Sequence, residues 1–188
     1  MYEHITPTLA ARARALDRTC GLTAIVAIDG RAGSGKSTLA GELIAELGCP
    51  LVQMESLYPG WNGLADGIDL LVTRVLEPLS LGGVAQVPQY NWHTNRFDTP
   101  VRLESPALLV VEGVGCGALN AAEFIGELLW LELDADERQR RALARESDGA
   151  AFAEHWNDWA AQEDTLLAAD PINERADLSI FQSATLGR

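Results

Sequence analysis

The chain has 188 residues, of which 47% are hydrophobic, and its 27 acidic residues outnumber 14 lysines and arginines to give a net charge of −13. This excess of carboxylates argues against binding DNA or RNA along a broad surface, which requires clustered cations. No apolar run approaches the roughly 20 residues of a membrane span, and the N-terminus lacks the pattern of a signal peptide. We therefore expect a single cytoplasmic domain over residues 1–188, with neither a nucleic-acid nor a membrane partner. The sequence leaves a homo-oligomer open.

The hydrophobic pattern predicts helices alternating with strands. An amphipathic helix is expected in an N-terminal extension, residues 1–20, and another helix from about Gly35 to Leu47. Residues 66–80 and two stretches after residue 134 also have a helical pattern. Short apolar runs typical of buried parallel strands cover residues 22–29, 49–54, 105–113, 128–133 and 175–181. This alternation predicts an α/β fold with a parallel sheet covered on both faces, which makes three layers.

Residues 82–104 interrupt the alternation, because they are long, aromatic and irregular in pattern. Long loops in compact domains are usually functional or disordered, so we expect a loop at a binding site here. Trp92 in this segment and Trp61 before it both lie in non-helical stretches. One of them is expected either to stack on a flat substrate or to be buried.

The segment "GRAGSGKS", residues 30–37, fits the phosphate-loop pattern G-x-x-x-x-G-K-[ST]. It lies between a predicted buried strand and a predicted helix, where consecutive backbone N–H groups and the helix N-terminus can surround an anion. Lys36 is expected to reach the β- and γ-phosphates of a nucleotide, and the Ser37 hydroxyl to bind Mg²⁺. The expected nucleotide-binding residues of this loop are Gly30, Ala32, Gly33, Ser34, Gly35, Lys36, Ser37 and Thr38.

Lys36 is the only lysine in the chain. GTPases read guanine with an Asn-Lys-x-Asp motif, and this chain has no second lysine to form one. The single lysine therefore favours another class of nucleotide-binding protein over a GTPase.

Two glutamates follow predicted strands that end beside the phosphate loop. Glu55 comes after "PLVQM" and Glu112 after "LLVV", and ligands bind at the carboxyl ends of parallel strands. A kinase needs a carboxylate to accept a proton from the acceptor hydroxyl and a second one near the metal. Either glutamate alone would be interpreted as a solvated charge at the end of a strand. Two of them beside a phosphate loop favour a functional role for both.

A cluster of arginines follows the fourth predicted strand. Arg138, Arg141 and Arg145 are spaced i, i+3, i+7 and share one helix face, whereas Arg140 points elsewhere. Three guanidinium groups on one face could close over a triphosphate as a lid, expected at residues 134–150. The alternative is a solvated stripe balanced by neighbouring acidic residues.

These motifs, in this order, resemble the uridine kinase group of P-loop kinases, which includes phosphoribulokinase and bacterial pantothenate kinase. The resemblance covers roughly residues 22–182. It rests on "VAIDGRAGSGKST" at the phosphate loop, "ESLY" (55–58), "VPQYNWHTNRF" (87–97), "VVEGV" (110–114), "LDADERQRRALARE" (133–146) and "RADLSI" (175–180). Three positions depart from the family pattern: Glu55 and Asn91 each replace an aspartate, and His93 falls closer to Tyr90 than the family's histidine does.

The resemblance implies a P-loop NTPase fold with strand order 2-3-1-4-5 and a helical lid. It implies ATP-dependent, Mg²⁺-assisted phosphoryl transfer to a hydroxyl of a small molecule, with a nucleoside as first choice. Kinases of pantothenate, a sugar phosphate or a nucleotide stay open as alternatives, as does a nucleotide-binding regulator or slow NTPase. The roles it implies are catalytic for Glu55 (the base), Lys36, Arg141 and Arg145, nucleotide-binding for Arg138, metal-binding for Ser37 and Glu112, and acceptor-binding for Tyr58, Tyr90, His93 and Arg96.

Overall fold

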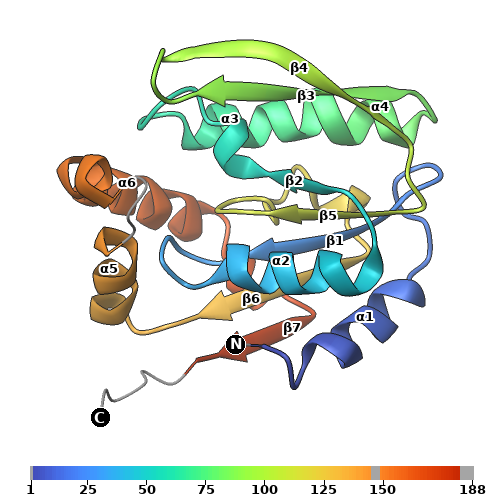
Figure 1. The fold of residues 1–188 in the computed structure, drawn as a ribbon, viewed down its shortest axis with the longest axis horizontal. Helices are drawn as coiled ribbons and strands as arrows, with labels where there is room; N and C mark the ends of the chain where they lie inside the picture. The colour runs from blue at the N-terminus through green and yellow to red at the C-terminus, as the bar shows by residue number, and fades with distance from the viewer. Residues whose placement is uncertain (1, 145–148, 183–188) are drawn as a thin grey trace.

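A five-stranded parallel sheet forms the centre of the structure, a computed structural model that describes residues 2–144 and 149–182. Its strands run side by side in the order β2-β5-β1-β6-β7, and every neighbouring pair is parallel (Figure 1). This confirms the predicted α/β fold with a five-stranded parallel sheet. The strands are β1 (Ala24–Asp29), β2 (Leu51–Gln53), β5 (Leu108–Glu112), β6 (Glu127–Glu132) and β7 (Leu178–Phe181).

The expected strand order, 2-3-1-4-5, is corrected to 2-5-1-6-7 once all strands of the chain are numbered. Two further strands, β3 (Val84–Asn91) and β4 (Arg96–Glu104), precede β5 in the chain and pair antiparallel in a sheet of their own. They occupy the segment that was expected to be an irregular loop. β4 is exposed along almost its whole length. Phe97, Val101 and Leu103 do alternate with charged residues, but Pro100 interrupts the run, and a proline argues against a strand.

Helices cover both faces of the central sheet. Side chains alternate between the faces along each strand, so Val26 and Ile28 of β1 pack with α1 (Thr6–Arg14) and α2 (Lys36–Leu47). Ile25 and Ala27 point to the opposite face, where they join the core formed with the segments that follow β2 and with α6 (Gly149–Ala169).

The chain between β2 and the hairpin is helical with one irregular turn. A 3₁₀ turn, η1 (Met54–Ser56), leads to α3 (Leu64–Leu71), a π-helical turn, η2 (Val72–Leu76), and α4 (Glu77–Ser80). Pro78 lacks the N–H that a regular helix would use at this point, which fits the wider turn just before it. The β3–β4 hairpin lies along the outer side of these helices in Figure 1.

The remaining short helices lie between the later strands of the chain. They are η3 (Ala122–Phe124), α5 (Ala135–Leu143) after β6, and η4 (Ile172–Glu174) before β7. In the part of the chain that the structure describes, no helix is both long enough and apolar enough to cross a membrane.

Candidate active site

The phosphate loop connects the end of β1 to the start of α2, as the sequence predicted. Gly33 and Gly35 have φ angles of 81° and 91°, a left-handed conformation that L side chains rarely adopt. A Cβ atom on Gly33 would lie 2.2 Å from the carbonyl oxygen of Arg138. Glycine is therefore required at position 33 both by the turn and by the close approach of α5.

Lys36 is the first residue of α2 and is only 7% exposed. Its Nζ donates a hydrogen bond to the carbonyl oxygen of Arg31, at 2.9 Å, across the loop. Burial lowers the pKa of Lys36, and the negative charges of Glu112, Glu163 and Asp29 oppose this shift. The ammonium group is thus buried near three carboxylates and beside the backbone of the phosphate loop. A phosphate group could replace the Arg31 carbonyl as its hydrogen-bond partner.

Asp29 lies beneath the phosphate loop, and the sequence analysis gave it no role. It is fully buried and accepts hydrogen bonds from the backbone N–H groups of Gly30 (2.6 Å), Gly115 (3.0 Å) and Gly117 (2.8 Å). Burial raises its pKa to about 6, against the lowering effects of these N–H groups and of Lys36. Asp29 thereby ties the start of the phosphate loop to the turn after β5.

Glu163 of α6 is a second residue that the sequence analysis missed. Its Oε1 accepts a hydrogen bond from the backbone N–H of Ala32, at 2.8 Å, and another from the indole N–H of Trp159, at 3.0 Å. Its carboxylate is 1% exposed, and burial raises its pKa. Only the fold brings Glu163 to a loop 131 residues away, so no local pattern in the sequence could have revealed this contact.

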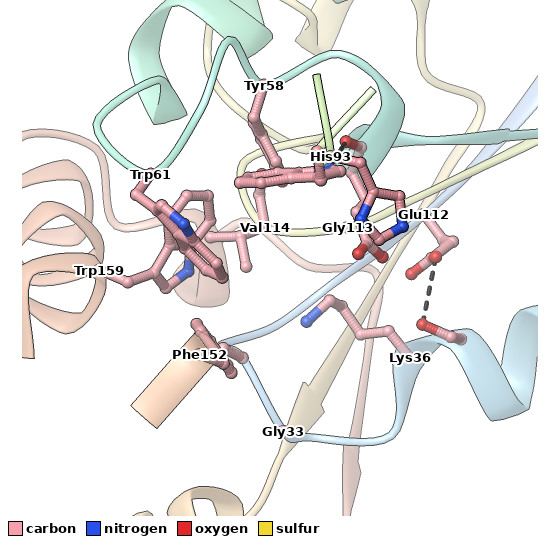
Figure 2. A pocket seen from close by; sticks show the side chains of 14 residues that line it. Gly33, Lys36, Tyr58, Trp61, His93, Glu112, Gly113, Val114, Phe152 and Trp159 are labelled. Carbon is pink, nitrogen blue, oxygen red and sulfur yellow. Dashed lines mark hydrogen bonds between the residues drawn. The ribbon is translucent and has the colours of Figure 1, made fainter. Parts of the chain in front are cut away.

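Ser37 and Glu112, the two expected metal-binding residues, both line one cavity, and Glu112 lies on its right in Figure 2. The Ser37 hydroxyl donates to Glu112 Oε1 at 3.2 Å, and the Gln53 side-chain amide donates to the same oxygen at 3.1 Å. The Ser37 hydroxyl and the Glu112 carboxylate offer oxygen ligands, which Mg²⁺ prefers. In kinases Mg²⁺ takes most of its other ligands from water and substrate phosphates. Among the described residues no group of three or more acidic, histidine or cysteine side chains could hold a metal by itself.

A cavity of about 350 Å³ opens beside the phosphate loop. In Figure 2 the Lys36 ammonium points into it between Phe152 and Glu112, while Trp61, Trp159 and Phe152 form the wall opposite Glu112. Glu55, from η1, also lines the cavity. The arrangement brings together a phosphate-binding loop, two carboxylates and an aromatic wall, and these come from five separate segments of the chain.

The expected acceptor-binding residues are divided between the cavity and the hairpin. Tyr58 and His93 line the cavity, and the Tyr58 hydroxyl donates to the carbonyl oxygen of Val114 at 2.7 Å. Tyr90 and Arg96 are not among the lining residues. Both lie near the turn of the β3–β4 hairpin, where Tyr90 pairs with Phe97 and Arg96 with Asn91. Arg96 is exposed.

The arginines of α5 differ in burial. Arg138 is buried and donates to the carbonyl oxygens of Leu133 and Ala32, at 3.2 and 3.3 Å. The Arg141 side chain is mostly buried and contacts Glu137 and Gln182, whereas that of Arg140 is largely exposed.

Arg145, the third arginine expected on the lid face, lies outside the described residues. Thr38 is exposed in the first turn of α2 and is not among the residues that line the cavity.

Solved structures with a similar fold include proteins described as kinases. A possible uridine kinase from Bacillus stearothermophilus is 18% identical with a TM-score of 0.67, over 95% of this chain and 98% of that one. A candidate fructose transport system kinase from Silicibacter sp. TM1040 is 18% identical with a TM-score of 0.57, over 94% and 98% of the two chains. Neither a protein-family profile nor a curated protein matches the sequence. At this identity the likeness establishes a shared fold.

Proposed function

We propose that the protein is a small-molecule kinase that transfers the γ-phosphate of ATP to a hydroxyl group. The observation that carries this proposal is the placement of Lys36 and Glu55 on one cavity. A phosphate-binding ammonium and a carboxylate able to accept a proton are the two groups that such a transfer requires. The fold that the chain shares with P-loop kinases supports the same reaction class.

In this proposal each side chain has a separate task. The loop amides and Lys36 bind and orient the phosphates, and Glu55 accepts the proton of the attacking hydroxyl. Ser37 and Glu112 would hold Mg²⁺, with Gln53 orienting the Glu112 carboxylate through the hydrogen bond between them. The metal would neutralise charge on the phosphate oxygens. Arg141, and by resemblance Arg145, would complete the site from the lid.

A nucleoside is the first choice of acceptor, by resemblance to the uridine kinase group. A regulator or slow NTPase remains the rival from another class, because a phosphate loop binds nucleotide in those proteins too. The two differ in one observable: a kinase consumes ATP faster when its acceptor is added, whereas a regulator binds ATP without an acceptor-dependent turnover.

The test is ADP release from Mg·ATP in the presence of a panel of nucleosides, pantothenate and sugar phosphates. We expect at least one compound to stimulate release, and we expect Lys36→Ala to lower the stimulated rate by orders of magnitude. Lys36→Arg serves as the matched control for charge. It should not restore the rate, because a planar guanidinium does not replace a compact ammonium in so small a buried slot. If ATP binds tightly and no compound in the panel stimulates ADP release, the result favours a nucleotide-binding regulator or slow NTPase over a kinase.

A further inference from the structure

The side of the cavity away from the phosphate loop is built almost entirely from aromatic rings. Trp61 stacks on Phe152 and on His155, with ring centroids 5.3 and 4.7 Å apart. Trp92 of the hairpin packs against Trp61 at 4.8 Å. Tyr58 and Trp159 complete the wall through an edge contact of 4.9 Å. The wall therefore draws on three segments of the chain, and its rings pack against one another.

Two of these rings are available to a ligand. Tyr58, Phe152 and Trp159 are at most 7% exposed, whereas Trp61 and Trp92 are only partly buried. The indole N–H of Trp92 donates to the carbonyl oxygen of Glu55 at 3.1 Å. This hydrogen bond holds a ring of the wall next to the proposed catalytic base. A ligand in contact with Trp92 would consequently lie within reach of Glu55.

The charges in the cavity are unfavourable for an anion. Among the described residues that line it, the charged side chains are Lys36, Glu55 and Glu112, and His93 is the one other basic residue. Lys36 donates to the loop carbonyl of Arg31, and in the proposed function its charge serves the nucleotide while Mg²⁺ takes Glu112. An acceptor with a phosphate or carboxylate group would therefore meet the Glu55 carboxylate, and no arginine or second lysine lines the described cavity.

The arginines near the cavity already have partners or lie away from it. Arg31 pairs with Asp164 at 2.5 Å, and Arg138 donates to backbone carbonyl oxygens. Arg141 contacts Glu137 and Gln182, and Arg96 is exposed on the hairpin. None of these four lines the described cavity.

We propose that the acceptor is an alcohol without an anionic group, and that a flat ring or an organic cation within it lies against Trp61 and Trp92. Both kinds of group are attracted to the faces of indole rings. The proposal rests on the proposed kinase function and narrows it, because it excludes pantothenate, sugar phosphates and nucleotides as acceptors. Figure 2 shows the aromatic wall that would receive the group, opposite Glu112.

Binding can be measured separately from turnover by calorimetry on the full chain. Saturating Mg²⁺ and the non-hydrolysable analogue AMP-PNP fill the phosphate loop, so that a probe cannot bind there through its own phosphate. The probes are matched pairs: uridine with uridine 5′-monophosphate, and 4-(hydroxymethyl)benzamide with 4-(hydroxymethyl)benzoate. In each pair we expect the uncharged member to bind at least about tenfold more tightly, because of the carboxylates in the cavity. An anionic member that binds as tightly as its partner, or a failure of every probe to bind, overturns the proposal.

A third pair identifies which group the wall recognises. Choline and 3,3-dimethylbutan-1-ol have the same shape but differ by one positive charge. Tighter binding of choline than of both uncharged ring compounds assigns the wall to a cation. Tighter binding of the ring compounds assigns it to a flat ring.

Variants test whether the wall itself is responsible. Trp92→Ala should abolish binding of the preferred probe, whereas Trp92→Phe, which keeps a ring but loses the N–H, should retain most of it. Phe97→Ala is the matched control, because Phe97 is an aromatic residue of the same hairpin that contacts Tyr90 and does not line the cavity. Equal binding by Trp92→Ala and wild type overturns the proposal. A probe that binds with the expected preference but never stimulates ADP release contradicts the kinase function and leaves the charge preference standing.

Discussion

Glu55, the proposed proton acceptor, lines the cavity beside the phosphate loop. It is exposed in η1, directly after β2, and its carbonyl oxygen is fixed by Trp92. Asp66 and Asp69, the acidic residues of the helix that follows, do not line the cavity. Asp69 instead lies next to Asn120, at 3.4 Å.

We therefore predict that Glu55→Gln lowers the rate of phosphoryl transfer by about 10²–10⁴-fold, the usual contribution of a general base. The affinity for ATP should change little, because Glu55 lies on the acceptor side of the cavity. Steady-state kinetics and ATP binding measure the two effects. Asp69→Asn is the control and should behave like wild type; a near-normal rate in Glu55→Gln would remove Glu55 from the mechanism.

At the scale of elements, α6 contacts both the phosphate loop and the aromatic wall through one carboxylate, that of Glu163. Glu163 holds both the Ala32 N–H of the phosphate loop and the indole N–H of Trp159 in the aromatic wall. Removing it leaves a buried indole N–H and a part-buried backbone N–H without their partner, and an unsatisfied buried donor costs about 1–3 kcal/mol. The phosphate loop and the aromatic wall are thus joined at a single residue.

Glu163→Ala is predicted to lower the free energy of unfolding by about 2–5 kcal/mol, from the loss of these two hydrogen bonds. Glu163→Gln keeps an oxygen that can accept both bonds, so it should lose much less. Urea denaturation followed by tryptophan fluorescence provides the comparison. Asp164→Ala, which removes the exposed partner of Arg31, is the control and should change stability by no more than about 1 kcal/mol. Equal losses in Glu163→Ala and Glu163→Gln would mean that the charge matters more than the hydrogen bonds.

The helix α5 offers a comparison of two neighbouring arginines. Arg141 lies on the side of the phosphate loop, and its partner Gln182 donates to the carbonyl oxygen of Ser34. To reach a triphosphate, the Arg141 guanidinium must leave Glu137, with which it now pairs at 2.8 Å. Arg140 pairs with the same glutamate but faces solvent.

If α5 acts as a lid, Arg141→Ala should lower phosphoryl transfer by at least about tenfold, as for a group that stabilises charge in transfer, while Arg140→Ala stays close to wild type. Transfer rates at low and high salt give the measurement. Gln182→Ala controls for the indirect effect of Arg141 on the loop and should cost less than Arg141→Ala. Equal, salt-sensitive losses at positions 140 and 141 would reduce the lid to a diffuse basic patch.

Some elements of the site could be predicted from the sequence because their signals are local. The phosphate loop needs glycines and a lysine at fixed spacing, and buried parallel strands are continuous apolar runs, so both were identified correctly. The β3–β4 hairpin was missed although Phe97, Val101 and Leu103 alternate with charged residues, because Pro100 interrupts the run and argues against a strand. The contact of Glu163 with the loop joins positions 131 residues apart, and a contact of that kind has no signature within either segment.

At the scale of the whole molecule, Asp29 links the central strand to two neighbouring segments and makes stability depend on pH. Two effects compete at this carboxyl group: burial favours the neutral form, and three backbone N–H donors favour the charged form. Burial dominates and raises the pKa from 3.8 to about 6. In the unfolded chain the group has an ordinary pKa, so between about pH 4 and 6 the folded protein binds more protons than the unfolded one. Stability contributed by Asp29 is therefore full below about pH 4 and is lost as the pH rises to about 6.

Asp29→Asn isolates this contribution, because the side chain of the variant does not titrate. Between pH 4 and pH 7 the unfolding free energy of the wild type should fall by about 2.5 kcal/mol relative to that of Asp29→Asn, at about 1.4 kcal/mol per pKa unit. Urea denaturation at a series of pH values measures it, and subtracting the two proteins cancels every other titrating group. A difference that does not vary with pH would show that Asp29 does not titrate in this window. A difference that shifts in favour of the wild type as the pH rises would show that the N–H donors of Gly30, Gly115 and Gly117 outweigh burial and lower the pKa instead.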